Sequence, residues 1–306
     1  MTPLVVWLPG NERAAAALAG ALACECAAVS VHRFPDGETS LAMAATLAGR
    51  DVAVHCTLDR PDDKLAALLF SASLARDLGA ASVGLVAPYL AYMRQDMRFH
   101  RGESVTARYF SHLLSAHFDW LVTVDPHLHR IATLDAVYTV PAIAVSAAGA
   151  IGEWLRNEVR NPGLVGPDAE SRQWVSAVAK FAGAPFTTLE KQRSGDHAVS
   201  VSAPDAAWLA DCTPVIVDDI ASTGRTLVAA AEAIRRAGAG SPCCVVVHPL
   251  FAGDAVQALA RAGVKRIVSC DSVAHATNAI ALDGGIAAAV GDMLGRMRER
   301  RSVILR

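Results

Sequence analysis

Two adjacent carboxylates followed by a run of small hydroxyl residues make residues 215–227 the stretch of this chain best suited to chemistry. An apolar strand pattern ends in Asp218 and Asp219, and a short loop leads from there into an alanine-rich helical pattern. The hydroxyl residues of this loop are Ser222, Thr223 and Thr226. The backbone N–H groups of such a loop and of the following helix N-terminus can hold a phosphate. Paired acids beside a phosphate site therefore indicate a phosphorylated sugar whose hydroxyl groups bind the carboxylates.

The same loop has two other interpretations. In a plain strand-to-helix turn, the Ser and Thr residues would only cap the helix, which leaves the paired acids without a role. The loop lacks the Gly-Lys-Ser/Thr of a Walker A motif, so nucleotide binding of that type is excluded. Ligands of α/β proteins bind at the carboxyl ends of the strands, which is where the two acids fall.

Two segments in the first half of the chain carry residues suited to nucleotide binding. A Pro-Asp-Gly turn within residues 33–38 presents an acid and an aromatic residue, although the same pattern fits an ordinary hairpin turn. A loop at residues 88–104 combines three arginines with two tyrosines and a glutamine. Guanidinium groups match phosphate oxygens and stack on aromatic rings. The apolar residues mixed into this loop argue against a merely solvated basic segment.

Two further segments suggest a metal ligand and a cationic catalytic loop. His127 follows a strand pattern, where its imidazole can bind a cation or a phosphate, although a lone histidine is more often structural. Lys191 and Arg193 lie two residues apart among Gly and polar residues. Such loops close over phosphates and neutralise the charge that develops during transfer. The alternative for this segment is a surface hairpin.

The composition predicts a cytoplasmic protein that binds neither nucleic acid nor a membrane. Hydrophobic residues make up 53% of the 306 residues, but no apolar run approaches the roughly 20 residues needed to cross a bilayer. The first apolar run follows the initial residues without a basic segment or cleavage site, so no signal peptide is expected. The seven cysteines form no CxxC pair, which favours reduced thiols. A net charge of −2 provides no general basic field for nucleic acid.

Strand-like and helical patterns alternate along the whole chain, which predicts an α/β fold with mainly parallel sheets. The strand-like runs are residues 4–8, 51–56, 82–87, 120–124, 164–166, 199–201, 214–217, 243–248 and 266–269. Strands that end in acids or in proline recur in both halves, which indicates two similar lobes. We expect a first lobe at residues 1–143 and a second at 144–285. A basic helical tail at 286–306 should pack on the first lobe or on a neighbouring subunit.

In this order, the segments resemble those of the ribose-phosphate pyrophosphokinase family, and the similarity runs from about residue 8 to residue 294. The acid pair and its loop also resemble the signature of the type I phosphoribosyltransferase fold, which the resemblance implies for each lobe. Four sets of site residues follow from the resemblance. The nucleotide-binding set is Phe34, Asp36, Gly37, Glu38, Arg94, Gln95, Asp96 and Arg101. The ribose-phosphate set is Asp218, Asp219, Ser222, Thr223, Gly224, Arg225 and Thr226. The metal ligands are His127 and Asp168, and the catalytic cations are Lys191 and Arg193.

The resemblance implies a magnesium-dependent transfer of a diphosphoryl group from ATP to the 1-hydroxyl of ribose 5-phosphate. The products would be 5-phosphoribosyl 1-diphosphate and AMP. Members of this family complete their sites with residues of neighbouring subunits, so self-association is expected, with the turn at residues 34–38 reaching into a neighbour.

The sequence departs from the family in the phosphate loop, beside Asp168, in the catalytic loop and after the Arg94-Gln95-Asp96 loop. Arg225 stands where the family commonly has glycine; it tolerates positive φ less well but offers a guanidinium to the phosphate. Glu170 adds a charge close to Asp168. Three alternatives stay open at this point: a regulatory homologue without activity, an enzyme that uses ADP or a related pentose phosphate, and a phosphoribosyltransferase that consumes the diphosphate. The last is disfavoured by the two-lobed length and by the Arg94-Gln95-Asp96 loop.

Overall fold

The computed structural model describes residues 2–98, 100–128, 130–189, 191–194, 198–201, 206–209 and 211–304, with the backbone alone at 191–194, 198–201, 206–207 and 304. The chain forms two compact units. Unit 1 comprises Met1–Val145 and Asp283–Arg306, and unit 2 comprises Ser146–Leu282. Within the described residues, no helix is both long enough and apolar enough to span a membrane.

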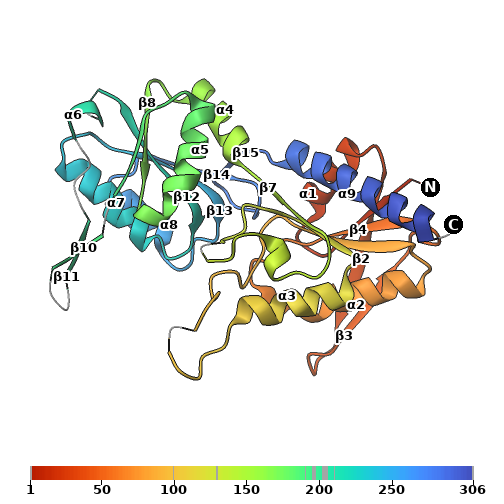
Figure 1. The fold of residues 1–306 in the computed structure, drawn as a ribbon. Coiled ribbons are helices and arrows are strands. Elements are labelled where there is room, and N and C mark those ends of the chain that lie inside the picture. The colour runs from red at the N-terminus through yellow and green to blue at the C-terminus, as the bar shows by residue number, and fades with distance from the viewer. Residues whose placement is uncertain are drawn as a thin grey trace. The chain divides into compact units, whose positions relative to one another are not determined.

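Unit 1 is built on a seven-stranded sheet in the order β3-β2-β1-β4-β5-β6-β7, parallel except for the β2–β3 hairpin. Its strands are β1 (Leu4–Trp7), β2 (Glu25–Arg33), β3 (Thr39–Met43), β4 (Asp51–His55), β5 (Ser82–Ala87), β6 (Trp120–Val124) and β7 (Ala142–Val145). Its helices are α1 (Glu12–Ala21), α2 (Pro61–Asp77), α3 (Thr106–His117), η1 (Leu134–Ala136) and α9 (Asp283–Ile304). Helices α2 and α3 cover one face of this sheet, and α1 and α9 cover the other (Figure 1).

Unit 2 has a parallel six-stranded sheet in the order β15-β14-β13-β12-β8-β9, together with the antiparallel pair β10–β11. Its strands are β8 (Pro162–Gly166), β9 (Phe186–Thr188), β10 (Lys191–Ser194), β11 (Ala198–Val201), β12 (Thr213–Ala221), β13 (Cys243–Pro249), β14 (Arg266–Cys270) and β15 (Asn278–Ile280). Its helices are α4 (Ala148–Glu158), η2 (Ala169–Ser171), α5 (Arg172–Ala182), α6 (Ala206–Leu209), α7 (Arg225–Arg236) and α8 (Ala255–Arg261). Helices α4 and α5 pack together on one face, and α7 and α8 on the other.

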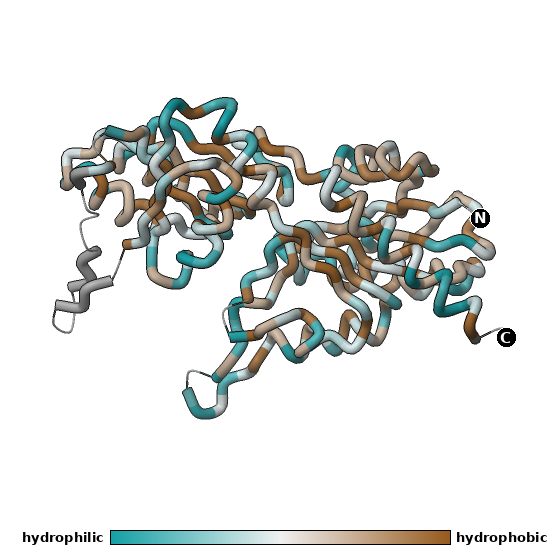
Figure 2. The backbone as a smooth tube through the Cα atoms, turned by 45° about the horizontal axis from the view of Figure 1, so that its top comes forward, coloured by the Kyte–Doolittle hydropathy of each residue, from teal (hydrophilic) through white to brown (hydrophobic). Residues whose placement is uncertain are grey.

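The central strands have continuous apolar sequences because helices cover both of their faces. Every residue of β4, β5 and β6 is buried, and the most hydrophobic stretches of backbone lie inside each unit (Figure 2). Trp120 fills the space beside Gly84, where an added Cβ would come within 1.8 Å of the indole ring. A side chain at Gly84 would therefore displace Trp120 from the core.

The predicted α/β class with mainly parallel sheets is confirmed, but several strands were not predicted. Strand β3 alternates half-buried with exposed residues, and in β2 only Val29 is fully buried. Without a buried stripe, they lack the apolar run that marks the central strands. The strands β7, β9, β10 and β15, of three or four residues each, are also absent from the predicted set.

The C-terminal helix α9 packs against α1, β6 and β7 and is fastened to the sheet by a buried carboxylate. Asp51, whose side chain is 4% exposed, bonds to Arg301 at 2.6 Å and to Arg298 at 3.2 Å. It also accepts a hydrogen bond from the Ser82 hydroxyl at 2.6 Å. Burial alone would raise the pKa of Asp51, but the hydrogen bonds from Ser82, Arg301 and Arg298 outweigh it and lower the pKa. The ionised carboxylate therefore stabilises the attachment of α9.

Asp51→Asn should destabilise the protein by about 3 kcal/mol, because it removes the buried partner of two arginines. Urea unfolding at pH 7 measures this change. A folded-state pKa below the unfolded value means that the stabilisation is present above about pH 4 and is lost as the pH falls further. Asp292→Asn, on the same helix, removes only an exposed pair with Arg296 and should cost about 0.3–0.5 kcal/mol. Equal losses in the two variants would contradict this account of Asp51.

Candidate functional site

The acid pair lies within the last four residues of β12, which extends to Ala221 rather than ending at the predicted residue 217, and Asp168 follows the neighbouring parallel strand β8. Strand β12 pairs with β8 as far as Ile216 and Val165, so Asp218 and Asp168 lie just beyond the paired region. From β8 the chain continues to β9 on one side, and from β12 it continues to β13 on the other. This is the topological switch point of the sheet, where α/β proteins bind their ligands.

The carboxylates at this switch point repel one another. Burial raises the pKa of Asp218 well above its usual value, and the charges of Asp219 and Asp168 raise it further. Asp218 accepts a hydrogen bond from Asp219 N at 3.0 Å, and Asp219 accepts one from Ile220 N at 2.8 Å. The Asp168 carboxylate accepts a hydrogen bond from Ser171 N at 3.1 Å. Hydroxyl donors or a cation placed here would relieve the repulsion.

The loop between β12 and α7 has the geometry of a phosphate site. Gly224 has φ of 71° and immediately precedes α7. The first-turn amides of α7 have no acceptor within the helix, and Gly224, the residue before the helix, has no side chain to cap them. Thr223 and Arg225 are exposed, whereas Ser222 and Thr226 are half-buried. The loop thus offers backbone amides, hydroxyls and one guanidinium to an anion.

Arg225 does not strain this loop, which answers the question that the sequence left open. The only positive φ of the loop falls on Gly224, and Arg225 is the first residue of α7. A residue with a side chain is therefore compatible with this position, and the long Arg225 side chain is exposed beside the helix N-terminus.

Lys191 and Arg193 belong to β10, where they pair with Val201 and Val199 of β11. The hairpin follows Leu189, which is buried in the core of unit 2. The side chains of Lys191 and Arg193 lie outside the described part of the structure, so their catalytic role stays a prediction.

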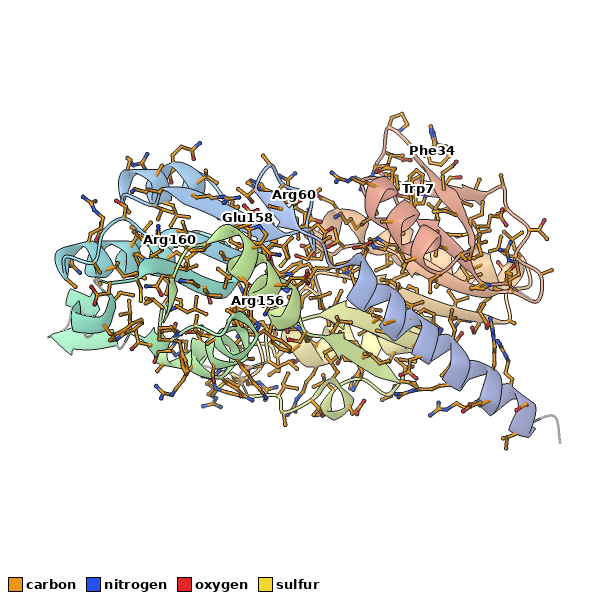
Figure 3. The ribbon with its side chains drawn as sticks, turned by 90° about the horizontal axis from the view of Figure 1, so that it is seen from above. Trp7, Phe34, Arg60, Arg156, Glu158 and Arg160 are labelled. Atoms are coloured by element: carbon orange, nitrogen blue, oxygen red, sulfur yellow. The ribbon has the colours of Figure 1, made fainter. Side chains whose placement is uncertain are left out.

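The candidate nucleotide residues of unit 1 form an exposed turn and a long loop. The turn joins β2 to β3 and is closed by a hydrogen bond from Phe34 N to Glu38 O at 2.8 Å. Asp36 accepts a hydrogen bond from Glu38 N at 3.1 Å, and Gly37 has φ of 93°. Phe34 is 44% exposed and lies at the outer end of the hairpin (Figure 3). A large exposed aromatic residue on a well-formed turn suits contact with another molecule.

The loop after β5 exposes Arg94 and Arg101 but buries the carboxylate between them. The side chain of Asp96 is 2% exposed and forms an ion pair with Arg130 at 3.2 Å. It also accepts a hydrogen bond from Arg130 N at 3.1 Å. Asp96 thereby ties this loop to the segment that follows β6. No local pattern in the sequence indicates this partner, although Arg130 stands three positions after His127.

His127 follows the end of β6, where the backbone is strained. Asp125 has φ of 30°, which is unfavourable for a residue with a side chain. His127 is half-buried, and its neighbour His129 lies outside the described residues. His127 belongs to unit 1 and Asp168 to unit 2. In the described parts of the chain, no group of three or more His, Cys, Asp or Glu side chains is arranged to hold a metal ion.

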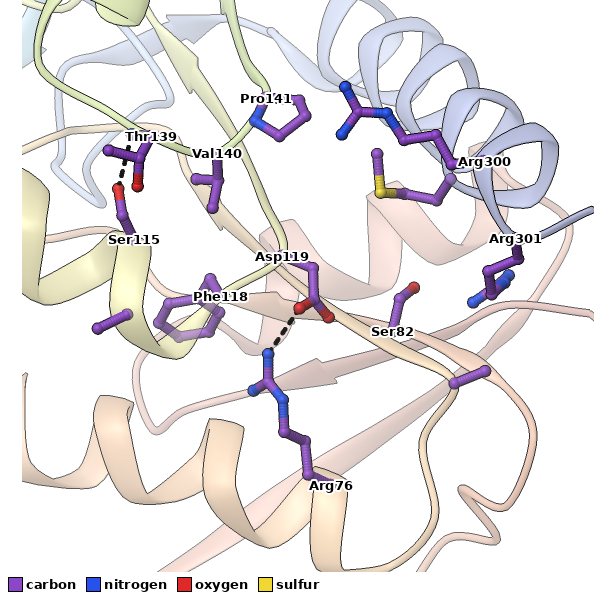
Figure 4. A pocket seen from close by; sticks show the side chains of 13 residues that line it. Arg76, Ser82, Ser115, Phe118, Asp119, Thr139, Val140, Pro141, Arg300 and Arg301 are labelled. Atoms are coloured by element: carbon purple, nitrogen blue, oxygen red, sulfur yellow. Dashed lines mark hydrogen bonds and ion pairs between the residues drawn. The ribbon is translucent and has the colours of Figure 1, made fainter. Parts of the chain in front are cut away.

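A cavity of about 420 Å³ lies at the amino ends of β5, β6 and β7 in unit 1, between these strands and α9 (Figure 4). Three arginines line it, and two of them bind carboxylates of the same unit. Arg76 pairs with Asp119 at 2.8 Å, and Arg301 pairs with Asp51 at 2.6 Å. None of the predicted site residues lines this cavity. It lies at the amino ends of the strands, whereas the loops that follow β5 and β6 lie at their carboxyl ends.

A parallel sheet with paired acids and a hydroxyl-rich loop at its switch point defines a phosphoribosyltransferase-type protein. A family profile described as the phosphoribosyl transferase domain matches residues 133–283. A second profile, the N-terminal domain of ribose phosphate pyrophosphokinase, matches residues 4–117. The chain belongs to the ribose-phosphate pyrophosphokinase family, as the sequence resemblance predicted.

Two relatives support this assignment, and one solved structure has a similar fold. Ribose-phosphate pyrophosphokinase of Methanopyrus kandleri is 36% identical over 280 residues, covering 91% of this chain and 95% of that protein. The enzyme of Methanobrevibacter smithii is 31% identical over 276 residues, covering 86% and 92%. The crystal structure of phosphoribosylpyrophosphate synthetase from Mycobacterium smegmatis has a similar fold, with a TM-score of 0.79, 21% identity and coverage of 96% and 99%.

Proposed function

We propose that this chain transfers a diphosphoryl group from ATP to the 1-hydroxyl of ribose 5-phosphate. The products are 5-phosphoribosyl 1-diphosphate and AMP. The observation that carries this proposal is the switch point of unit 2, where the acid pair and the phosphate loop are adjacent in a member of the ribose-phosphate pyrophosphokinase family. One site thus offers acceptors for sugar hydroxyls and donors for the sugar phosphate.

Unit 2 binds and orients ribose 5-phosphate in this proposal. Asp218 and Asp219 accept hydrogen bonds from ribose hydroxyls, while the loop at residues 222–226 holds the 5-phosphate. Its donors are the α7 amides, the loop hydroxyls and the Arg225 guanidinium. The anomeric oxygen then attacks the β-phosphorus of ATP, and AMP leaves. Lys191 and Arg193 stabilise the charge on the transferred group, since phosphoryl transfer depends mainly on positioning and charge neutralisation.

The residues of the site fit Mg²⁺. Carboxylate oxygens are the hard ligands that this ion prefers, and it keeps several waters, so few protein ligands suffice. Burial and the charges of Asp219 and Asp168 raise the pKa of Asp218, so a cation bound among these carboxylates would reduce their repulsion. His127 and Asp168 would hold the ion, whose chemistry is the neutralisation of phosphate charge.

Unit 1 supplies the nucleotide-binding residues in this proposal. Arg94 and Arg101 are exposed and available to phosphates, Gln95 can pair with the base, and Asp96 holds the loop in place through Arg130. The exposed turn at residues 34–38 contacts the nucleotide of a neighbouring subunit, so the active form is an oligomer. All seven cysteines are free, which supports a reducing, cytoplasmic location.

A substrate panel followed by ³¹P NMR tests the proposal against its alternatives. The donors are ATP and ADP, the acceptors are ribose 5-phosphate and arabinose 5-phosphate, and a further sample contains 5-phosphoribosyl 1-diphosphate with a nucleobase. We expect AMP and a sugar 1-diphosphate from ATP and ribose 5-phosphate. Product from ADP or from arabinose 5-phosphate alone would indicate altered substrate choice. Absence of turnover by the folded oligomer in every sample would favour a regulatory homologue.

A further inference from the structure

The loop that follows β13 contains a bulky residue in an unfavourable backbone conformation. Phe251 has φ of 33°, in the left-handed region that a residue of its size rarely adopts. Such conformations persist only where the surrounding structure holds them, and they gather at functional sites. Phe251 is not among the residues implied by the sequence resemblance, and it lies directly beside the phosphate loop.

The backbone of this loop holds the start of the phosphate loop. Phe251 N donates a hydrogen bond to Ala221 O at 2.8 Å, and Ala252 N donates one to Ser222 O at 2.9 Å. A Cβ built on Gly224 would lie 3.4 Å from the Cβ of Ala255, so the next part of the phosphate loop rests on the start of α8. The conformation at Phe251 therefore fixes where the carbonyls of Ala221 and Ser222 lie. The positions of these carbonyls in turn set the directions of the backbone N–H groups that follow them.

The ring of Phe251 is held by a histidine from the next connection along the sheet. Its centroid lies 4.9 Å from that of His275, at an interplanar angle of 47°. His275 is fixed at two points: its backbone N donates to the Asn278 side chain at 2.9 Å, and its Nδ1 accepts from Thr277 N at 3.2 Å. Asn278 in turn donates to Cys270 O at 2.7 Å.

We propose that Phe251 and His275 form a ring brace that positions the phosphate loop for the 5-phosphate of the sugar. Neither residue touches the substrate in this arrangement; both act through the carbonyls of Ala221 and Ser222. The brace explains why an unfavourable φ is kept at Phe251, because the ring contact fixes the backbone from which Phe251 N and Ala252 N donate. The expected effect on substrate binding rests on the proposed function. The expected effect on the conformation of the loop does not depend on it.

The test compares three variants of the protein. His275→Ala removes the ring contact, His275→Phe restores a ring, and Arg266→Ala is the control. The guanidinium of Arg266, at the amino end of β14, lies 4.8 Å from the centre of the Trp154 ring. Arg266→Ala therefore removes a ring contact at the opposite end of the strand from His275. The readouts are the KM values for ribose 5-phosphate and for ATP, and the hydrogen exchange of the peptide spanning residues 218–227.

His275→Ala should raise the KM for ribose 5-phosphate about tenfold, leave the KM for ATP unchanged and speed exchange in the loop peptide. His275→Phe should recover most of both effects, and Arg266→Ala should show neither. Unchanged exchange in His275→Ala, or equal changes in Arg266→Ala, would overturn the brace. If the wild-type protein is inactive and exchange still rises only in His275→Ala, the brace stands and the proposed function fails.

Discussion

Replacing Lys191 by alanine should lower kcat by about 10²–10³-fold while changing the KM for ribose 5-phosphate little. The reason is that the ammonium group would act on charge that develops only in the transition state, and removal of one such group costs roughly 3–4 kcal/mol. Steady-state kinetics with ATP and ribose 5-phosphate at saturating Mg²⁺ measure the change. The backbone of Lys191 lies in the β10–β11 hairpin, which follows directly from the core of unit 2.

Lys180→Ala provides the matched control, because it removes an exposed lysine from the last turn of α5 in the same unit. Its kcat should stay within about twofold of the wild-type value, as for a surface substitution away from any site. Near-normal turnover in Lys191→Ala would remove this residue from the catalytic role. A rise in KM with unchanged kcat would instead place it in ground-state binding.

Asp218→Asn should lower kcat/KM for ribose 5-phosphate about 100-fold and at the same time stabilise the unliganded protein. The loss of activity follows because hydrogen bonds from the ribose hydroxyls to a charged carboxylate are replaced by weaker ones. The gain in stability follows because burial, Asp219 and Asp168 all disfavour the charged form of Asp218. We expect the free energy of unfolding to rise by about 1 kcal/mol at pH 7 in the presence of a chelator.

The pH dependence gives the sign of this effect. Because the pKa of Asp218 is raised in the folded state, its ionisation reduces stability as the pH rises above the unfolded value of about 4. That decline should be absent from the Asn variant. Asp211→Asn, which changes an exposed acid of unit 2, should alter neither activity nor stability. A loss of stability in Asp218→Asn would contradict the view that the site holds its acids at a cost to folding.

The elements that surround the acid pair were predictable because their signals are local. The apolar run of β12, the acid pair, the hydroxyl-rich loop and the alanine-rich helix α7 follow one another within about 20 residues. The hairpin β2–β3 was not predictable as strands, since only Val29 of β2 is fully buried and neither face carries an apolar stripe. The turn between them was nonetheless visible from its Pro-Asp-Gly sequence.

The contacts that support the site could not be predicted from the sequence, because they join residues that are far apart in the chain. Asp96 and Arg130 are 34 positions apart, and nothing local shows that the acid of the nucleotide loop is buried against that arginine. Phe251 lies between β13 and β14, and His275 lies between β14 and β15. The left-handed backbone at Phe251 could not be predicted, because the residue is not the glycine or asparagine that usually adopts it. The sequence alone also left the effect of Arg225 open, because only the structure shows that Gly224 takes the positive φ.

The most direct test of the central claim follows the atoms of the transfer itself. Ribose 5-phosphate labelled with ¹⁸O at the anomeric oxygen would be incubated with ATP, Mg²⁺ and the protein, and the products analysed by ³¹P NMR. Attack of that oxygen on the β-phosphorus predicts a sugar 1-diphosphate with an isotope shift on the phosphorus bonded to the sugar, together with unlabelled AMP. Formation of ADP and a sugar carrying a single new phosphate, or label in the AMP, would contradict diphosphoryl transfer by this chain.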